Sequence, residues 1–479
     1  MEKKTHIAVL PSPGFSHLVP IIEFSKRFIH LHPDFHVTCI IPTLGSPPTS
    51  SKAYLRSLPS NIHPIFLPPI NEDAIPKDVY VGTRIQLTVT KSLPSLLDAL
   101  KTLTSEAPLA AIVVDPFSFQ VLDFAKELNI LSFMYFPASA MTLSFFLYCP
   151  KLDHQIPGEF RDSAQPIQFP GCVPLHGSDL PDPVQDRSSH VYKEFVERSR
   201  RLCLIDGILV NSFVEMEEGP VRALEEGAGR GGGNPQVYPV GPITRTGSNQ
   251  NDSDSDSDSD FCVRWLDRQP CDSVLYVSFG SGGTLSQHQI NELAFGLEMS
   301  EKRFLWVVRA PSNSVNAAYL GSSTNEDPLQ FLPEGFLERT KEQGLVIPSW
   351  APQIPILSHS STAAFLSHCG WNSVLESIQH GVPLISWPLF AEQRMNAFML
   401  TNVLKVGLRP KVNNDGIVER DEIAKVIRSL MEGEESKEIK RKMKVLRESA
   451  ITAVKEDGSS TKTMSEVAQK WKIFSGLFF

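Results

Sequence analysis

The sequence lacks any hydrophobic run long enough to cross a membrane. Even residues 141–149, the most apolar stretch, span only nine positions, whereas a spanning helix needs roughly 18 or more. Near the N-terminus, four apolar residues (7–10) precede a proline, and this run is too short for the core of a secretory signal. We therefore expect a soluble, cytoplasmic protein without a transmembrane segment.

Cysteine and positive charge are also in short supply. The seven cysteines are scattered and form no Cys-x-x-Cys pair, which fits neither a disulfide framework nor a zinc ribbon. The chain has 45 Lys and Arg against 54 Asp and Glu, a formal net charge of −9. Because a nucleic-acid-binding surface normally carries a basic excess, we expect no nucleic-acid partner.

Several motifs of common enzyme classes are missing. The sequence has no GxxxxGK[ST] loop and no GxSxG elbow, which weighs against nucleoside triphosphatases and serine hydrolases. Gly280, Gly282 and Gly283 follow an apolar run, but Leu285 breaks the GxGxxG pattern of a dinucleotide-binding loop.

What the chain does contain is a repeated alternation of apolar runs of strand length with stretches of helix length. Such alternation predicts α/β architecture with parallel sheets, and 41% hydrophobic residues suffice for large cores. The runs fall into two series: residues 6–10, 36–42, 110–116 and 207–213, then residues 273–280, 303–309, 344–350, 363–368 and 382–388. Two series imply two domains.

Between the two series, residues 227–260 are rich in Gly, Asn, Ser and Asp. This composition predicts a linker or exposed loop. Its acidic run, 252–260, contains Asp-x-Asp repeats like the metal-holding motif of one class of sugar transferases, but in a low-complexity tract we favour a solvated tether. The predicted division is an N-terminal domain at 1–245, a linker at 246–262, a C-terminal domain at 263–455, and a C-terminal helix at 456–479 that packs back on the N-terminal domain.

The densest chemistry lies in residues 350–393. An apolar strand, 363–368, leads through Gly370 into a predicted helix that opens with Asn372 and Ser373. A helix N-terminus after a glycine offers unpaired N–H groups and a positive dipole end, which suits a phosphate. A capped helix in an ordinary βα unit explains these features singly, but the same segment adds an aromatic face and several acceptors for hydroxyl groups.

Residues 350–393 resemble the 44-residue signature box of plant secondary-product glycosyltransferases, the UDP-sugar-dependent family 1 enzymes. The match runs from Trp-Ala-Pro-Gln through His-Cys-Gly-Trp-Asn-Ser to the closing Glu-Gln. HIAVLPSPG, HLVPIIEFSKR, FLPPIN and SFGSGG resemble the hydroquinone (arbutin-forming) and monolignol branch. The resemblance implies a GT-B fold, in which two Rossmann-like domains face each other across a cleft and the C-terminal one holds the donor.

The resemblance also implies roles for residues of the donor site. Trp350 stacks on uracil and Ala351 meets its edge; Gln353 and Glu376 hold the ribose; the diphosphate contacts His368, Asn372, Ser373 and Ser281; the sugar contacts Trp371, Glu392 and Gln393. A closing Gln and the Trp at position 371 are what the family's glucose users carry, so UDP-glucose is the expected donor.

The predicted catalytic pair is His17 and Asp115. Both follow strands, 6–10 and 110–116, and open parallel sheets place their ligands at the carboxyl ends of strands. His suits a general base near neutral pH, and an Asp would fix its tautomer. His17 also matches the family's base position. The family commonly has Gly directly before this His, whereas here the turn is Gly14-Phe15-Ser16-His17, which leaves the shape of the acceptor pocket open.

We therefore expect an inverting transfer of glucose to an aromatic hydroxyl, without a metal or cofactor, by a monomer. Candidates for the acceptor pocket, or equally for plain core, are Phe15, Phe117, Phe119, Phe145 and Phe146. The alternatives are a non-catalytic UDP-sugar binder or sensor, another sugar donor, and a nitrogen, sulfur or carbon nucleophile.

Overall fold

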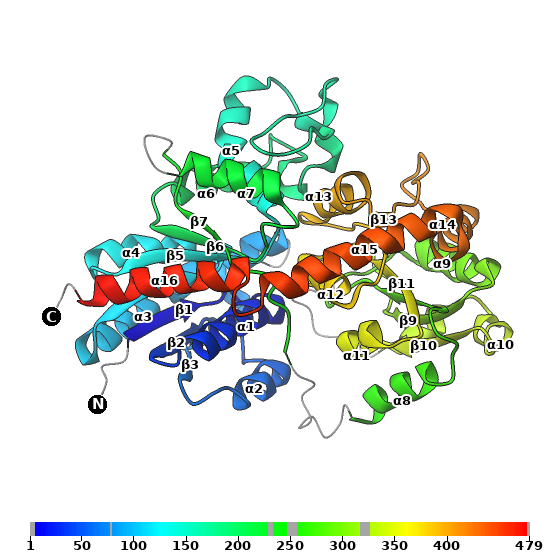
Figure 1. Ribbon diagram of the computed structural model, residues 1–479, viewed down its shortest axis with the longest axis horizontal. Coiled ribbons are helices and arrows are strands. Elements are labelled where there is room, and N and C mark those ends of the chain that lie inside the picture. Colours follow the sequence, from blue (N-terminus) through cyan, green and yellow to red (C-terminus); the bar gives the residue numbers. More distant parts are fainter. Residues whose placement is uncertain (1–4, 77–78, 229–232, 247–255, 317–325, 477–479) are drawn as a thin grey trace. The chain divides into compact units, whose positions relative to one another are not determined.

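The computed structural model describes residues 5–76, 79–228, 233–246, 256–316 and 326–476. The chain divides into two units. The first contains residues 1–178, 183–247 and 452–479, and the second contains residues 179–182 and 248–451. Each has its own sheet and hydrophobic core (Figure 1).

The first unit is built on a parallel sheet in the order β3-β2-β1-β4-β5-β6-β7. Its seven strands are β1 (Thr5–Leu10), β2 (Phe35–Ile41), β3 (Ile62–Phe66), β4 (Leu109–Val114), β5 (Leu131–Phe136), β6 (Gly207–Val210) and β7 (Val237–Pro239). In the central β4, LAAIVV, all six residues are buried. A strand apolar throughout is what a parallel sheet covered on both faces requires.

Helices connect these strands. The α-helices of this unit are α1 (Phe15–Leu31), α2 (Thr49–Arg56), α3 (Val81–Glu106), α4 (Leu122–Glu127), α5 (Ala140–Gln155), α6 (His190–Leu202), α7 (Glu218–Gly227) and α16 (Ser459–Gly476). Short 3₁₀-helices include η1 (Glu72–Ala74), η2 (Pro116–Val121) and η3 (Phe160–Asp162).

The C-terminal helix α16 packs against β1, β4 and β7 of the first sheet (Figure 1). Trp471 is fully buried, with its ring 5.0 Å from that of Phe28 and 5.2 Å from that of Phe133. Arg27 of α1 donates to the hydroxyl of Thr461 at 2.9 Å. The last helix is therefore part of the core of the unit that contains the N-terminus.

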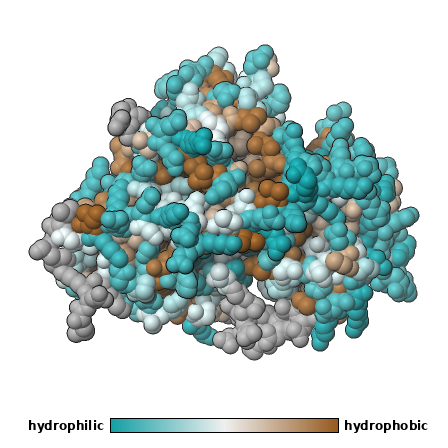
Figure 2. Space-filling view, in the orientation of Figure 1, coloured by the Kyte–Doolittle hydropathy of each residue, from teal (hydrophilic) through white to brown (hydrophobic). Residues whose placement is uncertain are grey.

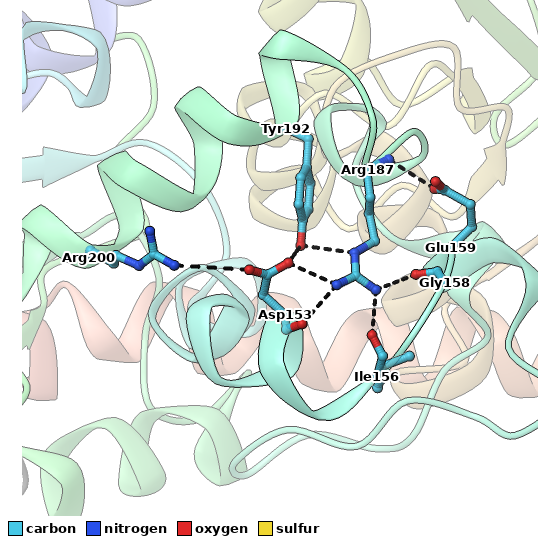
Figure 3. A network of polar contacts seen from close by, with 7 residues as sticks. All are labelled: Asp153, Ile156, Gly158, Glu159, Arg187, Tyr192 and Arg200. Carbon is cyan, nitrogen blue, oxygen red and sulfur yellow. Dashed lines mark hydrogen bonds and ion pairs between the residues drawn. The ribbon is translucent and has the colours of Figure 1, made fainter.

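A polar network holds the C-terminal end of α5 (Figure 3). Arg187 donates to the carbonyl oxygens of Asp153 (2.8 Å), Ile156 (2.6 Å) and Gly158, and it pairs with the Asp153 carboxylate at 2.8 Å. Tyr192 of α6 donates to the same carboxylate. One guanidinium thus occupies carbonyls that a helix end leaves unpaired and ties α5 to α6.

The second unit has a parallel sheet in the order β10-β9-β8-β11-β12-β13. Its strands are β8 (Val274–Ser278), β9 (Arg303–Val308), β10 (Gly344–Pro348), β11 (Thr362–Ser367), β12 (Leu384–Ser386) and β13 (Gly407–Leu408). Its helices are α8 (Asp256–Leu266), α9 (Gln287–Ser300), α10 (Phe336–Arg339), α11 (Gln353–Ser358), α12 (Trp371–His380), α13 (Gln393–Phe398), α14 (Arg420–Glu432) and α15 (Glu434–Ala453), with the 3₁₀-helix η6 (Pro328–Phe331) and the π-helix η7 (Met399–Val403).

Both units thus have the parallel α/β architecture that the sequence predicts, and the prediction of this fold class is confirmed. The predicted linker at 227–260 is wrong in two places. Residues Val237–Pro239 form β7, because their side chains are buried and their backbone pairs with β6, and α8 already begins at Asp256. Of the acidic run, residues 252–255 lie outside the described residues, and residues 256–260 form the start of α8.

Figure 2 shows one face, on which hydrophilic residues predominate and hydrophobic residues occur in scattered groups. Among the described residues, no helix combines the length and the apolar character that crossing a membrane requires.

Candidate active site

In the first unit, the ends of two neighbouring strands bring His17 and Asp115 together. β1 and β4 are paired, with Leu10 opposite Val114, so the first turn of α1 and the start of η2 lie at the same edge. His17 Nδ1 is 2.9 Å from Asp115 Oδ2, and only 12% of the His17 side chain and 2% of the Asp115 side chain are exposed. The predicted pair is thus in direct contact.

Asp115 is held by two further donors. The backbone N–H of Phe117 donates to Asp115 Oδ1 at 3.1 Å, and the hydroxyl of Ser12 donates to the same oxygen. Ser12 also lies 3.0 Å from the hydroxyl of Ser118. An ionised carboxylate only accepts hydrogen bonds, so the neutral tautomer that fits this contact has its proton on Nδ1 and its lone pair on Nε2.

The five candidate phenylalanines lie in different surroundings. Phe117 packs edge-on against the His17 ring, with centroids 5.3 Å apart, and Phe15 packs edge-on against Tyr54. Phe119 is buried, and the guanidinium carbon of Arg201 lies over it, 5.3 Å from the centroid of the Phe119 ring. Phe145 and Phe146 are buried in a cluster of aromatic rings within the unit. Phe117 thus contacts the His17–Asp115 pair directly, through its ring and its backbone N–H.

In the second unit, β8 and β11 pair with Ser278 opposite Ser367. Their carboxyl ends therefore place the turn at Gly280 beside the segment that leads into α12. The His368 ring lies between two glycines, because a Cβ at Gly280 or Gly370 would come within 2.5 Å of the ring. Gly370 is the N-cap of α12, and Asn372 and Ser373 stand in its first turn. The first turn has neither an acidic residue nor a side-chain cap, which suits an anionic ligand.

His368 is kept neutral. Burial, together with the nearby charge of Arg309, lowers the pKa of His368 to about 4. A neutral imidazole donates one hydrogen bond without bringing a buried charge. Among the described residues its buried Nδ1 has no partner.

Gln353 links two helices at the predicted ribose position. Its amide nitrogen donates to the Ser373 hydroxyl at 2.9 Å and to Glu376 Oε2 at 2.6 Å. Close by in the sequence, Ala351 is buried but Trp350 is 49% exposed. A large exposed aromatic face beside polar groups suits a stacking surface for a flat ligand.

Three further predicted donor residues lie at the starts of α12 and α13. Trp371, the first residue of α12, is 3% exposed. Gln393, the first residue of α13, is buried, and its side-chain oxygen accepts from the backbone N–H of Leu389 (2.8 Å) and Phe390 (3.0 Å). These bonds occupy the oxygen, so the amide nitrogen of Gln393 is the group suited to a sugar hydroxyl. Glu392 lies 3.4 Å from Asn396 Nδ2.

Sequence reasoning missed three residues that support these sites. Ser12 binds Asp115, Asn396 donates to the carbonyl of Cys369 at 2.9 Å, and Arg309 follows β9. The signal for Arg309 was present, because it ends a predicted strand and ligands gather at such ends. In the described part of the chain, no cluster of three or more His, Cys, Asp or Glu side chains could hold a metal ion.

Two parallel-sheet units, one with a His–Asp pair and one with a phosphate-suited helix N-terminus beside an exposed Trp, define the class of nucleotide-sugar transferases with a GT-B fold. The comparisons identify the family. The model for UDP-glucoronosyl and UDP-glucosyl transferases matches residues 261–451. Hydroquinone glucosyltransferase of Rauvolfia serpentina is 50% identical, over 98% of this chain and 99% of the relative. UDP-glycosyltransferase 72B1 of Arabidopsis thaliana is 48% identical, over 98% and 97%.

Solved structures of glycosyltransferases match the chain over nearly its whole length. A UDP-glucosyltransferase from Polygonum tinctorium has a TM-score of 0.89 at 49% identity, over 98% of this chain and 99% of that one. UGT2 of Phytolacca americana has a TM-score of 0.88 at 46% identity, over 98% and 100%. The chain therefore belongs to the family of UDP-glucoronosyl and UDP-glucosyl transferases, in its plant branch, and is a UDP-glycosyltransferase.

Proposed function

We propose that the protein transfers glucose from UDP-glucose to the hydroxyl group of a small aromatic acceptor, with inversion, to give a β-D-glucoside. The observation that carries this proposal is the contact between His17 and the buried Asp115 in a chain 50% identical to a hydroquinone glucosyltransferase. A protein that only bound UDP-sugars would have no use for a base with a fixed tautomer.

The proposed reaction begins at His17. Its Nε2 removes the proton of the acceptor hydroxyl as the oxygen attacks the anomeric carbon of glucose. The carbon–oxygen bond to the diphosphate breaks on the opposite face, and UDP leaves with the bonding electrons. Asp115 stabilises the imidazolium that forms on His17.

The departing diphosphate is stabilised by the N-terminus of α12. Backbone N–H groups and the positive dipole end act there, together with the side chains of Ser373 and the neutral His368. These groups offer hydrogen bonds without a metal ion, and we expect activity in the presence of a chelator.

Relatives support an aromatic acceptor. The Polygonum tinctorium enzyme is described as capable of glucosylating indoxyl, and its structure holds 3,4-dichloroaniline. The Phytolacca americana enzyme was solved with UDP-2fluoro-glucose and pterostilbene. Small planar phenols are therefore the first acceptors to test, followed by monolignols, flavonoids and indolic hydroxyls.

The test is a mass-spectrometric assay of glucoside formation from UDP-glucose and this panel. We expect His17→Ala to lose about 10²–10⁴-fold in kcat, the usual contribution of a general base, while its Kd for UDP stays within twofold of wild type. Near-normal turnover by His17→Ala would rule out the base. UDP binding without a product from any acceptor would favour a sensor instead.

A further inference from the structure

Arg309 stands at the carboxyl edge of the second sheet. It directly follows β9, which lies between β10 and β8. The turn after β8 carries Ser281, and the segment after β10 carries Trp350, two of the predicted donor contacts. Arg309 is therefore placed to reach both loops from the strand between them.

The guanidinium does bridge these two loops. Nη1 donates to the carbonyl oxygen of Ser281 at 2.6 Å, and Nη2 donates to the carbonyl oxygen of Ser349 at 2.9 Å. Ser349 has a φ of 65°, an unfavourable conformation for a residue with a side chain. Its N–H donates to the Val308 carbonyl at 2.7 Å, so both polar groups of the Ser349 backbone are bound by the end of β9.

The charge of Arg309 is not matched by an acidic partner. Within the described ranges, no carboxylate lies at ion-pair distance from it, and burial lowers its pKa from the ordinary value. Arg309 also lines a pocket together with Ser278, Gly280 and Thr284. A cation held only by two carbonyls, beside the turn expected to meet a diphosphate, adds favourable potential for an anion.

We propose that Arg309 is a positioning residue for the donor: its planar fork fixes the turn at Ser281 relative to Trp350, so that one ligand can meet both. This inference rests on the proposed function, since it assumes that these loops bind UDP-glucose. Lysine keeps the charge but is a point donor and does not reproduce the fork.

The experiment compares Arg309→Met and Arg309→Lys by calorimetry with UDP and with uridine, which has no phosphate. For Arg309→Met we expect about tenfold weaker UDP binding and about fivefold weaker uridine binding, because the surface for uracil is no longer held. Arg309→Lys should recover part of the UDP affinity and none of the uridine affinity. The KM for UDP-glucose should rise with the Kd, while kcat at saturation stays within about threefold, since Arg309 is not expected to touch the reacting atoms.

Arg303→Met is the matched control, because Arg303 is an exposed arginine at the opposite end of the same strand. A double variant that combines Arg309→Met with Trp350→Ala tests whether Arg309 affects uridine binding by positioning Trp350. If it does, Arg309→Met has no further effect on uridine binding once Trp350 is replaced by Ala. A general loss of structure would instead add to the Trp350→Ala effect and lower the thermal midpoint.

Three results would overturn the proposal. The first is wild-type affinity for UDP and uridine in Arg309→Met, and the second is wild-type affinity for both ligands in Arg309→Lys. The third is an unchanged affinity for uridine in both variants, which would mean that Arg309 acts only through its charge. These readouts use binding and not turnover. If wild type itself does not bind UDP, the proposed function fails; if wild type binds and the variants match it, only the role of Arg309 fails.

Discussion

Asp115 accepts hydrogen bonds from three donors: the His17 ring, the Phe117 N–H and the Ser12 hydroxyl. Each bond stabilises an ionised carboxylate beside His17, the proposed base. Hydrogen bonds to charged groups are worth about 1.5–3 kcal/mol, so under the proposed mechanism we expect Ser12 to support His17 although Ser12 need not touch a substrate.

We predict that Ser12→Ala lowers kcat about tenfold and leaves the KM for UDP-glucose unchanged, because the donor residues lie on other elements. Steady-state kinetics with the best phenolic acceptor measure both constants. Ser118→Ala, which removes the other hydroxyl near Ser12, is the control and should have the smaller effect. Turnover of Ser12→Ala within twofold of wild type would show that Ser12 only fills space.

The sequence could predict His17 and Asp115 because the family match and the strand ends both point to them. Ser12 lies in the same turn, between two prolines, but a serine there carries no signal until the sheet register brings it to Asp115. The position of Arg309 at the end of a predicted strand was a signal, but its contacts were hidden, since its partners are carbonyl oxygens, which leave no mark in the identity of residues 281 and 349.

At the scale of elements, α5 depends on a distant arginine. Arg187 satisfies carbonyls at the C-terminal end of the helix (Figure 3). Its guanidinium also lies 4.5 Å from the ring centroid of Phe160. Arg200 approaches the same Asp153 carboxylate only at 4.0 Å, and its side chain is 49% exposed.

We predict that Arg187→Met lowers the free energy of unfolding by about 2–4 kcal/mol, because three carbonyl oxygens and the partly buried Asp153 carboxylate lose a charged donor together. Arg200→Met, a matched change on the same carboxylate, should cost about 0.5 kcal/mol or less, as exposed ion pairs do. Urea unfolding followed by circular dichroism gives both values. Equal losses in the two variants would contradict the role of Arg187.

Strands with uniform apolar runs were predictable, whereas β7 was not. Val237–Pro239 has three residues and stands among Gly and Asn, so composition outweighed it. Pairing with β6 and burial under α16 decide its structure, and both are contacts with distant parts of the chain. For the same reason β13, with two residues, has no signal of its own.

At the scale of the whole molecule, each unit contains a histidine that folding keeps neutral. Burial, and then the charges of His36 and His63, lowers the pKa of His6 to about 4, and His6 lies opposite His36 in the pairing of β1 with β2. The pKa of His368 is also lowered to about 4. In the unfolded chain both would titrate near 6.5.

The sign of the pH dependence follows from these pKa values. Above about pH 6.5 both histidines are neutral in either state, so their contribution to stability is fully present. Between about pH 6.5 and 4 the unfolded chain binds protons that the folded chain does not, so the free energy of unfolding decreases as the pH is lowered.

We predict that the urea midpoint decreases as the pH is lowered from about 6.5 to 4, and that His6→Gln makes this dependence of the midpoint on pH less steep. His30→Gln, which changes an exposed histidine in the last turn of α1, is the control. An identical slope in wild type and His6→Gln would mean that protonation elsewhere governs acid unfolding.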